Sequence, residues 1–131
     1  MISMLDLKKQ YQSIKGQVDP AVIEVFTSGK FILGEYVEKF EKEAQDYLHV
    51  NRAIGLNSGT DALRIALVAC GIKKGDEVIT TPFTFFATTE VISELGAVPV
   101  FADIESSTFN IDPEKIKKAV TSKTRAVITP L

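Results

Sequence analysis

Hydrophobic residues follow two different rhythms along this chain of 131 residues. In the first fifty residues the apolar positions recur every three or four residues, most clearly over Glu35–Leu48, where charged side chains occupy the opposite face. From residue 52 onward, short apolar runs alternate with longer segments of helical character. The pattern therefore predicts helices in the first part and a repeat of strand and helix in the second.

The first part contains a second predicted helix and an apolar loop. Asp19 followed by Pro20 predicts a helix start, because proline is favoured at the first helical position, and Gly29 predicts the end of that helix. Residues 29–34 (Gly-Lys-Phe-Ile-Leu-Gly) lie between the two helices. Three exposed apolar side chains in one loop are unfavourable, so we expect this loop to pack on the core or on a second subunit.

The second part predicts an α/β fold with a mostly parallel sheet and flanking helices. We expect strands at residues 53–56, 77–80, 98–102 and 126–129, and helices at residues 60–70, 87–95 and 113–120. Only Arg64 is charged between Ala62 and Cys70, so we expect this helix to be buried on several sides and Cys70 to be a buried thiol of low reactivity. A strand of a parallel sheet normally leads to a covering helix, so the chain is expected to stop inside a domain.

Composition and charge narrow the classes of function. The chain is 45% hydrophobic and 24% charged, which is typical of a globular domain with a core, and its net charge of −2 offers no basic surface for nucleic acid. No apolar run approaches the length of a membrane span, and no secretory signal is visible, so we expect a cytoplasmic location. The single cysteine excludes an internal disulfide, and no cluster has metal-ligand spacing.

The turn at residues 57–63 (Asn-Ser-Gly-Thr-Asp-Ala-Leu) is the first candidate site. It follows a predicted strand and opens a predicted helix, so unpaired N–H groups and the positive end of the helix dipole meet there, as a phosphate requires. The alternative is a capping box, in which Ser58 and Asp61 satisfy the turn and no ligand is needed. A carboxylate at Asp61 would also repel a phosphate if it pointed inward.

A second turn, at residues 80–89, follows the next predicted strand. It would lie on the same carboxyl edge of the sheet, where ligands of open α/β folds bind. We expect Phe83 and Phe86 to anchor this loop in the core, and Phe85 to present its ring to a flat ligand. A phosphate site beside an aromatic ring indicates a planar cofactor that bears a phosphate.

Several segments in register resemble the DegT/DnrJ/EryC1/StrS family of sugar aminotransferases, from about Leu5 to Pro130. They are residues 31–34, 40–41, 57–63, 75–80, 82–85, 96–104 and 108–113. The resemblance implies the large domain of an aspartate-aminotransferase-like fold and the cofactor pyridoxal 5'-phosphate. It also implies transfer of an amino group, usually from glutamate, to a nucleotide-linked keto-sugar, by a homodimer. Residues 1–51 would form an N-terminal helical segment and residues 52–131 the first part of the cofactor-binding domain.

The resemblance also implies roles for particular residues. Ser58, Gly59 and Thr60 would hold the cofactor phosphate, and Phe85 would stack on its ring. The loop containing Phe31 and Gly34 would lie near the substrate and the subunit interface. We expect Asp103 only to orient the loop that follows it.

The catalytic groups of such an enzyme are not expected in this chain. In the family, the Schiff-base lysine and the aspartate that binds the pyridinium nitrogen lie beyond the residue that matches Leu131. The chain's lysines, such as Lys73, Lys74 and Lys115, have the pattern of surface charges, and His49 that of a helix end. The 131 residues alone are therefore expected to be inactive. Two alternatives stay open: a non-catalytic relative that acts as a regulatory or binding partner, and a related pyridoxal enzyme with an amino acid substrate.

Overall fold

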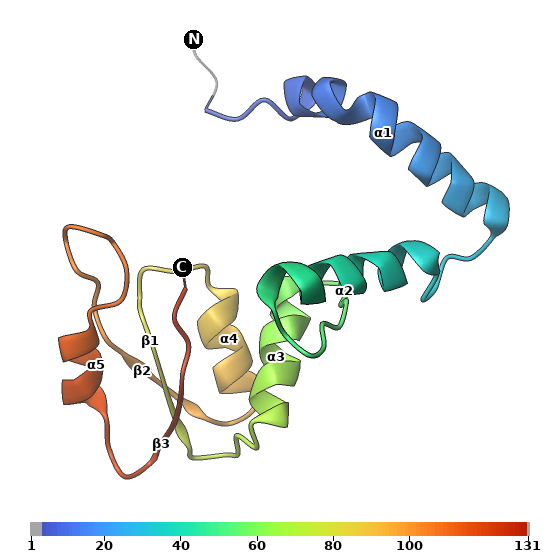
Figure 1. Ribbon diagram of the computed structural model, residues 1–131. Coiled ribbons are helices and arrows are strands. Elements are labelled where there is room, and N and C mark those ends of the chain that lie inside the picture. Colours follow the sequence, from blue (N-terminus) through green and yellow to red (C-terminus); the bar gives the residue numbers. More distant parts are fainter. Residues whose placement is uncertain (1–3, 131) are drawn as a thin grey trace. The chain divides into compact units, whose positions relative to one another are not determined.

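A computed structural model describes residues 4–130 of the chain. Its elements, labelled in Figure 1, are α1 (Leu7–Ser28), α2 (Glu35–Leu48), α3 (Gly59–Ala69), β1 (Glu77–Thr80), α4 (Ala87–Glu94), β2 (Val98–Phe101), α5 (Pro113–Ala119) and β3 (Thr124–Val127). They form two compact units, Met1–Gly55 and Leu56–Leu131, called here the N-terminal and C-terminal units. The predicted domain boundary between residues 51 and 52 stays a prediction.

Helix α1 is longer than the sequence predicts. It begins at Leu7, because the Asp6 carboxylate accepts a hydrogen bond from the Lys9 N–H at 3.0 Å and caps the first turn. The predicted start at Asp19 is wrong: Pro20 lies inside the helix, and Asp19 accepts a hydrogen bond from the Tyr11 hydroxyl at 2.7 Å. A helix that is already capped upstream continues through Pro20 and loses one backbone hydrogen bond.

Two predictions for this part of the chain are confirmed: Gly29 ends α1, and a helix, α2, spans Glu35–Leu48. Gly29 ends α1 with a left-handed φ of 68°, where a side chain would be strained. Gly34 precedes α2, and a Cβ there would stand 2.8 Å from the carbonyl oxygen of Lys30, so the turn needs a glycine. His49 ends α2 in a left-handed conformation, in agreement with its expected place at a helix end.

The C-terminal unit is built on a three-stranded parallel sheet in the order β2-β1-β3, which confirms the α/β expectation (Figure 1). Strand β1 and the helices α3, α4 and α5 lie within one residue of their predicted bounds, and β3 begins two residues earlier than predicted. The predicted strand at residues 53–56 is wrong. A strand is stable only beside another strand, and these residues join no sheet in the described chain, so Ile54 is 78% exposed.

The core lies on both faces of the sheet. Val78 and Ile79 are adjacent in β1 and fully buried, and they point to opposite faces. Val78 packs with residues of α3 and α4, among them Leu67 and Val91, whereas Ile79 packs with Ile111 and the apolar side of α5. The carboxyl end of β1 is thereby held between two packed layers.

Helix α3 is less buried than its composition predicts. Only Leu67 is buried in it; Ile65 and Val68 are 50% and 57% exposed, and Cys70 is exposed. The predictions of a helix buried on several sides and of a buried thiol are therefore wrong for the described chain. Composition shows that a helix can be buried, but neighbouring elements decide how much of it is. Across residues 4–130, none of the helices has the length and apolar character that crossing a membrane requires.

Candidate functional site

The start of α3 combines a capping interaction with free amide groups. The Ser58 hydroxyl accepts a hydrogen bond from the Asp61 N–H and donates one to the Asp61 carboxylate, each at 3.1 Å. One half of the predicted capping box, the bond from the Asp61 N–H to Ser58, is thus present, whereas the Asp61 carboxylate accepts from the Ser58 hydroxyl. This arrangement leaves two donors unused, because the N–H groups of Gly59 and Thr60 make no hydrogen bond within residues 4–130.

These two donors are accessible. Gly59 is exposed, and a Cβ added to it would have no atom within 4 Å, so the space beside the first helical turn is open. Thr60 is half-buried and follows it in the same turn. Free N–H groups at the positive end of an 11-residue helix fit a phosphate group, which accepts several hydrogen bonds and carries negative charge.

The carboxylate of Asp61 does not stand unpaired beside these donors. Its Oδ1 is 2.7 Å from Nη1 of Arg64, and the same guanidinium donates to Oε2 of Glu94 at 2.7 and 2.9 Å. The hydrogen bond to Glu94, and next its charge, raise the pKa of Arg64. Sequence reasoning missed this group. The spacing of three residues between Asp61 and Arg64 is a signal that could have revealed half of it.

The loop after β1 is shaped by its threonines. The Thr81 hydroxyl accepts the Phe83 N–H at 3.1 Å, and the hydroxyls of Thr84 and Thr88 are 3.4 Å apart. Phe85 is 80% exposed, and its contact with a ligand stays a prediction. The predicted anchors are wrong: Phe83 and Phe86 are 62% and 71% exposed. The buried residues that follow the loop belong to α4; they are Ala87, Thr88, Val91 and Ile92.

Phe85 belongs to a hollow at the carboxyl edge of the sheet. The hollow is lined by Thr81, Pro82, Thr84, Phe85, Phe86, Thr89 and Phe101. Phe83 is not among these lining residues, and its ring lies 6.1 Å from that of Phe109, measured between centroids. The Thr80 hydroxyl, at the end of β1, is the one buried side-chain polar atom of the described residues that lacks a hydrogen-bond partner.

The fold brings the two predicted turns to adjacent helices. Gly59 opens α3, Phe85 lies two residues before α4, and these helices pack on each other and on the sheet. In Figure 1 the loop that leaves β1 passes over this edge into the first turn of α4. Amide donors and an exposed aromatic ring thus occupy one side of the C-terminal unit.

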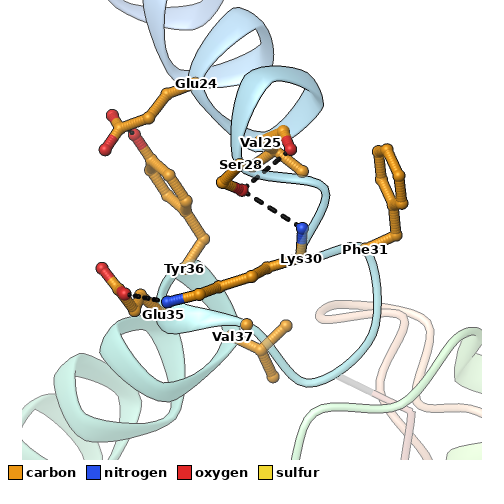
Figure 2. Close-up of a pocket in the computed structure, with 9 residues that line it drawn as sticks. Glu24, Val25, Ser28, Lys30, Phe31, Glu35, Tyr36 and Val37 are labelled. Carbon is orange, nitrogen blue, oxygen red and sulfur yellow. Dashed lines mark hydrogen bonds and ion pairs between the residues drawn. The ribbon is translucent and has the colours of Figure 1, made fainter.

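A second hollow lies in the N-terminal unit, where α1 turns into α2 (Figure 2). Phe31 and Gly34 line it, and two polar pairs bridge the turn: Lys30 Nζ to Glu35 Oε1 at 2.7 Å, and the Tyr36 hydroxyl to Glu24 at 2.8 Å. The hydrogen bond to Glu35 raises the pKa of Lys30, and the same bond lowers the pKa of Glu35.

The apolar loop beside this hollow is exposed. Ile32 and Leu33 are 85% and 75% exposed, and Phe31 meets the Phe26 ring edge-on at 5.8 Å. The loop is therefore not buried within its own unit. Packing on the core or on a second subunit stays a prediction.

Asp103 has the role expected of it. Its Oδ1 accepts the Ile104 N–H at 2.8 Å, and Lys115 lies 3.5 Å from its Oδ2. The Ile104 N–H, and next the charge of Lys115, lower the pKa of this carboxyl. Every lysine of residues 4–130 is exposed except Lys115, which is half-buried and held by acceptors. In the same range, no three acidic, histidine or cysteine side chains form a group able to hold a metal ion.

The comparisons with known proteins define the class of this chain. The model of the DegT/DnrJ/EryC1/StrS aminotransferase family matches residues 12–130. The chain belongs to this family, whose members include sugar aminotransferases. It is 50% identical over 127 residues to a "pleiotropic regulatory protein" of Geobacillus stearothermophilus, and 41% identical over 128 residues to a UDP-2-acetamido-2-deoxy-3-oxo-D-glucuronate aminotransferase of Pseudomonas aeruginosa.

Solved structures agree with this class. DesV of S. venezuelae, in complex with a ketimine intermediate, superimposes with a TM-score of 0.92 at 38% identity, covering 98% of this chain and 34% of that one. NtdA of Bacillus subtilis, with bound cofactor PMP, has a TM-score of 0.78 at 44% identity, covering 82% and 25%. The two curated relatives named above match 97–98% of this chain, and the chain spans only 34–36% of their length, about a third.

Proposed function

We propose that the protein is a pyridoxal-phosphate-dependent aminotransferase that transfers an amino group from glutamate to a nucleotide-linked keto-sugar. The observation that carries the proposal is the pair of unused amide donors at Gly59 and Thr60, on the same side of the C-terminal unit as the exposed ring of Phe85. Membership of the aminotransferase family supports the reaction class. The keto-sugar nucleotide named for the Pseudomonas relative supports the substrate class.

Each proposed site residue has a physical role. The N–H groups of Gly59 and Thr60 donate to the phosphate, and Ser58 holds the turn open by its bonds to Asp61. Phe85 covers one face of the pyridine ring. When bound, the cofactor supplies a ring that withdraws electrons from the reacting carbon. The neighbour solved with PMP, the aminated form of the same cofactor, supports this choice.

The lysine that attaches the cofactor is proposed to lie outside these 131 residues. Such a lysine must lose its charge near neutral pH, which requires burial away from carboxylates. The lysines of residues 4–130 are exposed or, in Lys115, held by Asp103 and Asp112. We therefore infer that residues 52–131 contribute the phosphate site and ring wall of a larger cofactor-binding domain, and that the 131 residues alone do not turn over.

The remaining proposals concern assembly and location. The loop with Phe31 and Gly34, next to the helical segment of residues 1–51, is proposed to contact substrate and a second subunit of a homodimer. Its exposed apolar residues support this, because an exposed Phe-Ile-Leu run is unfavourable in water. A nucleotide-sugar substrate supports a cytoplasmic location.

The test measures cofactor and turnover separately. The protein, produced at its native length, is incubated with pyridoxal phosphate, and the absorbance of the bound cofactor is recorded. Formation of 2-oxoglutarate from glutamate is then followed with UDP- and dTDP-linked 3-keto-sugars. Cofactor uptake with turnover supports the proposal. Absence of cofactor uptake contradicts it.

A regulatory function is the second candidate, because the relative with 50% identity carries a regulatory name. Uptake of cofactor without turnover of any keto-sugar or amino acid would favour it. Turnover of an amino-acid-derived keto substrate alone would instead favour a related pyridoxal enzyme.

A further inference from the structure

We propose that Arg64 is a positioning residue that keeps the carboxylate of Asp61 from competing with the cofactor phosphate. The inference rests on the proposed function, since it requires a phosphate at the amides of Gly59 and Thr60. Arg64 itself has no contact with those amides. It acts through Asp61, which lies in the same helical turn.

Asp61 is the residue best placed to occupy the phosphate site. Its carboxylate lies in the first turn of α3, where the helix dipole attracts negative charge and the N–H groups of Gly59 and Thr60 have no acceptor in the described residues. A carboxylate that turned back onto these groups would cap the helix and close the site. Even without turning back, an uncompensated charge there would repel a phosphate.

Both oxygens of Asp61 are held elsewhere. Oδ1 accepts from Arg64 Nη1 at 2.7 Å, and Oδ2 accepts from the Ser58 hydroxyl at 3.1 Å. The bond to Arg64 supplies the compensating charge, because the Ser58 hydroxyl is neutral. Removal of Arg64 would therefore free one oxygen and expose the full negative charge of Asp61.

Arg64 is itself fixed from the far side. Its Nη2 and Nε both donate to Oε2 of Glu94, at the end of α4 and 30 residues away in the sequence. A guanidinium held by this fork cannot rotate freely, so the donor directed at Asp61 keeps its place. The side chains of Asp61 and Arg64 are 30% and 39% exposed, so solvent screens part of the interaction.

The simpler explanation is that Arg64 only ties α3 to α4 through Glu94. The two explanations differ in what the neighbouring residues do. If Arg64 serves the phosphate site, its loss should be repaired by removing the charge of Asp61. If Arg64 is only a tie, Glu94→Gln should have the same effect as Arg64→Met, and Asp61→Asn should repair nothing.

The experiment compares the native-length wild-type protein with Arg64→Met, Asp61→Asn, the double variant and Glu94→Gln. Asparagine keeps the acceptor for Ser58 and the backbone N–H that Ser58 caps. For each protein, the dissociation constants of pyridoxal phosphate, by absorbance, and of inorganic phosphate, by calorimetry, are measured together with Tm. Inorganic phosphate is a readout that depends on neither turnover nor the attaching lysine.

We expect Arg64→Met to weaken binding of both ligands roughly threefold to tenfold, the size of one partly screened charge near a helix end. The double variant should bind within about twofold of wild type, because the charge to be offset is gone. Glu94→Gln should lower Tm but change the affinities less than about twofold, since the Arg64–Asp61 bond remains.

Two results would overturn the inference alone. The first is that the wild-type protein binds the ligands and Arg64→Met binds them with the same affinity. The second is that the double variant binds them as weakly as Arg64→Met does. If the wild-type protein binds neither pyridoxal phosphate nor inorganic phosphate, the proposed function is wrong, and the role of Arg64 is wrong with it.

Discussion

The two units of this chain differ in how they are held together. Every buried apolar residue of the described chain belongs to the C-terminal unit, and helices α1 and α2 of the N-terminal unit contain none. The strands and helices of the C-terminal unit bury their apolar faces against one another. The N-terminal helices instead depend on caps, the glycine turn and exposed ion pairs such as Lys39–Glu43. Exposed ion pairs contribute little to the free energy of unfolding. A strong helical pattern can therefore form a helix without forming a core.

The same substitution should have very different effects on stability in the two units. Ile92 is fully buried in α4, and Ile23 is 63% exposed in α1. Ile92→Ala should lower the free energy of unfolding by about 2–4 kcal/mol, because it leaves a cavity, whereas Ile23→Ala should change it by less than about 0.5 kcal/mol. Urea denaturation followed by circular dichroism measures both. Equal losses would mean that α1 is buried in the protein in solution.

The next prediction concerns the amide donors of the C-terminal unit. Gly59→Pro removes one N–H at the first helical position, where proline is tolerated and where the extended backbone of Ser58 suits a following proline. We expect the dissociation constant for pyridoxal phosphate to rise by about tenfold or more. Gly59→Ala is the matched control, because its Cβ meets no atom within 4 Å and the N–H stays. If Gly59→Pro binds pyridoxal phosphate as tightly as Gly59→Ala does, the N–H of Gly59 does not contribute to binding.

The two exposed rings of the loop after β1 offer a matched pair. Phe85 lines the hollow at the sheet edge, whereas Phe83 contacts Phe109. Phe85→Leu should weaken binding of pyridoxal phosphate roughly threefold to tenfold, through loss of stacking. Phe83→Leu should leave that affinity within about twofold, since Phe83 does not line the hollow. A larger effect at Phe83 would mean that Phe83, and not Phe85, stacks on the cofactor ring.

The N-terminal unit should respond to loss of its cap. Asp6→Ala removes the carboxylate that accepts the Lys9 N–H, which should destabilise the first turns of α1 by about 1 kcal/mol. Hydrogen exchange of the amides near residue 9, recorded by mass spectrometry, measures the loss. Asp6→Asn, which keeps a capping oxygen, is the control and should exchange nearly as slowly as the wild type. Unchanged exchange in Asp6→Ala would show that tertiary contacts, and not the cap, hold this end.

The smallest effect is a pH dependence at Asp103. Its pKa is lowered chiefly by the Ile104 N–H and next by Lys115, so the folded protein favours the ionised carboxylate. The stabilisation is therefore complete above the ordinary aspartate pKa, and it is lost as the pH falls through the lowered pKa. Asp103→Asn should slightly flatten the loss of stability in acid, measured as Tm between pH 5 and pH 3, with Glu105→Gln as the control. A steeper loss in Asp103→Asn would contradict the sign.

Several local elements could be predicted because their signals lie within a few residues of one another. The apolar spacing of α2, the strand β1 between turns and the glycine that ends α1 were all predicted at their observed bounds. The backbone role of Asp103 was equally local, since it bonds the next residue. The turn at Ser58 was also visible, although two alternatives for it were open, and the structure contains the cap together with the free donors.

Tertiary structure alone decided which apolar residues are buried and which charges meet. Phe83, Phe86 and Cys70 are apolar or weakly polar, yet all three are exposed in the folded chain. Residues 53–56 have strand-like composition, but a strand forms only beside a partner, which no local pattern can supply. The Arg64–Glu94 bond joins α3 to α4 through two residues that are 30 positions apart in the sequence. Periodicity and caps act through neighbours along the chain, whereas burial and charge pairing depend on distances that exist only after folding.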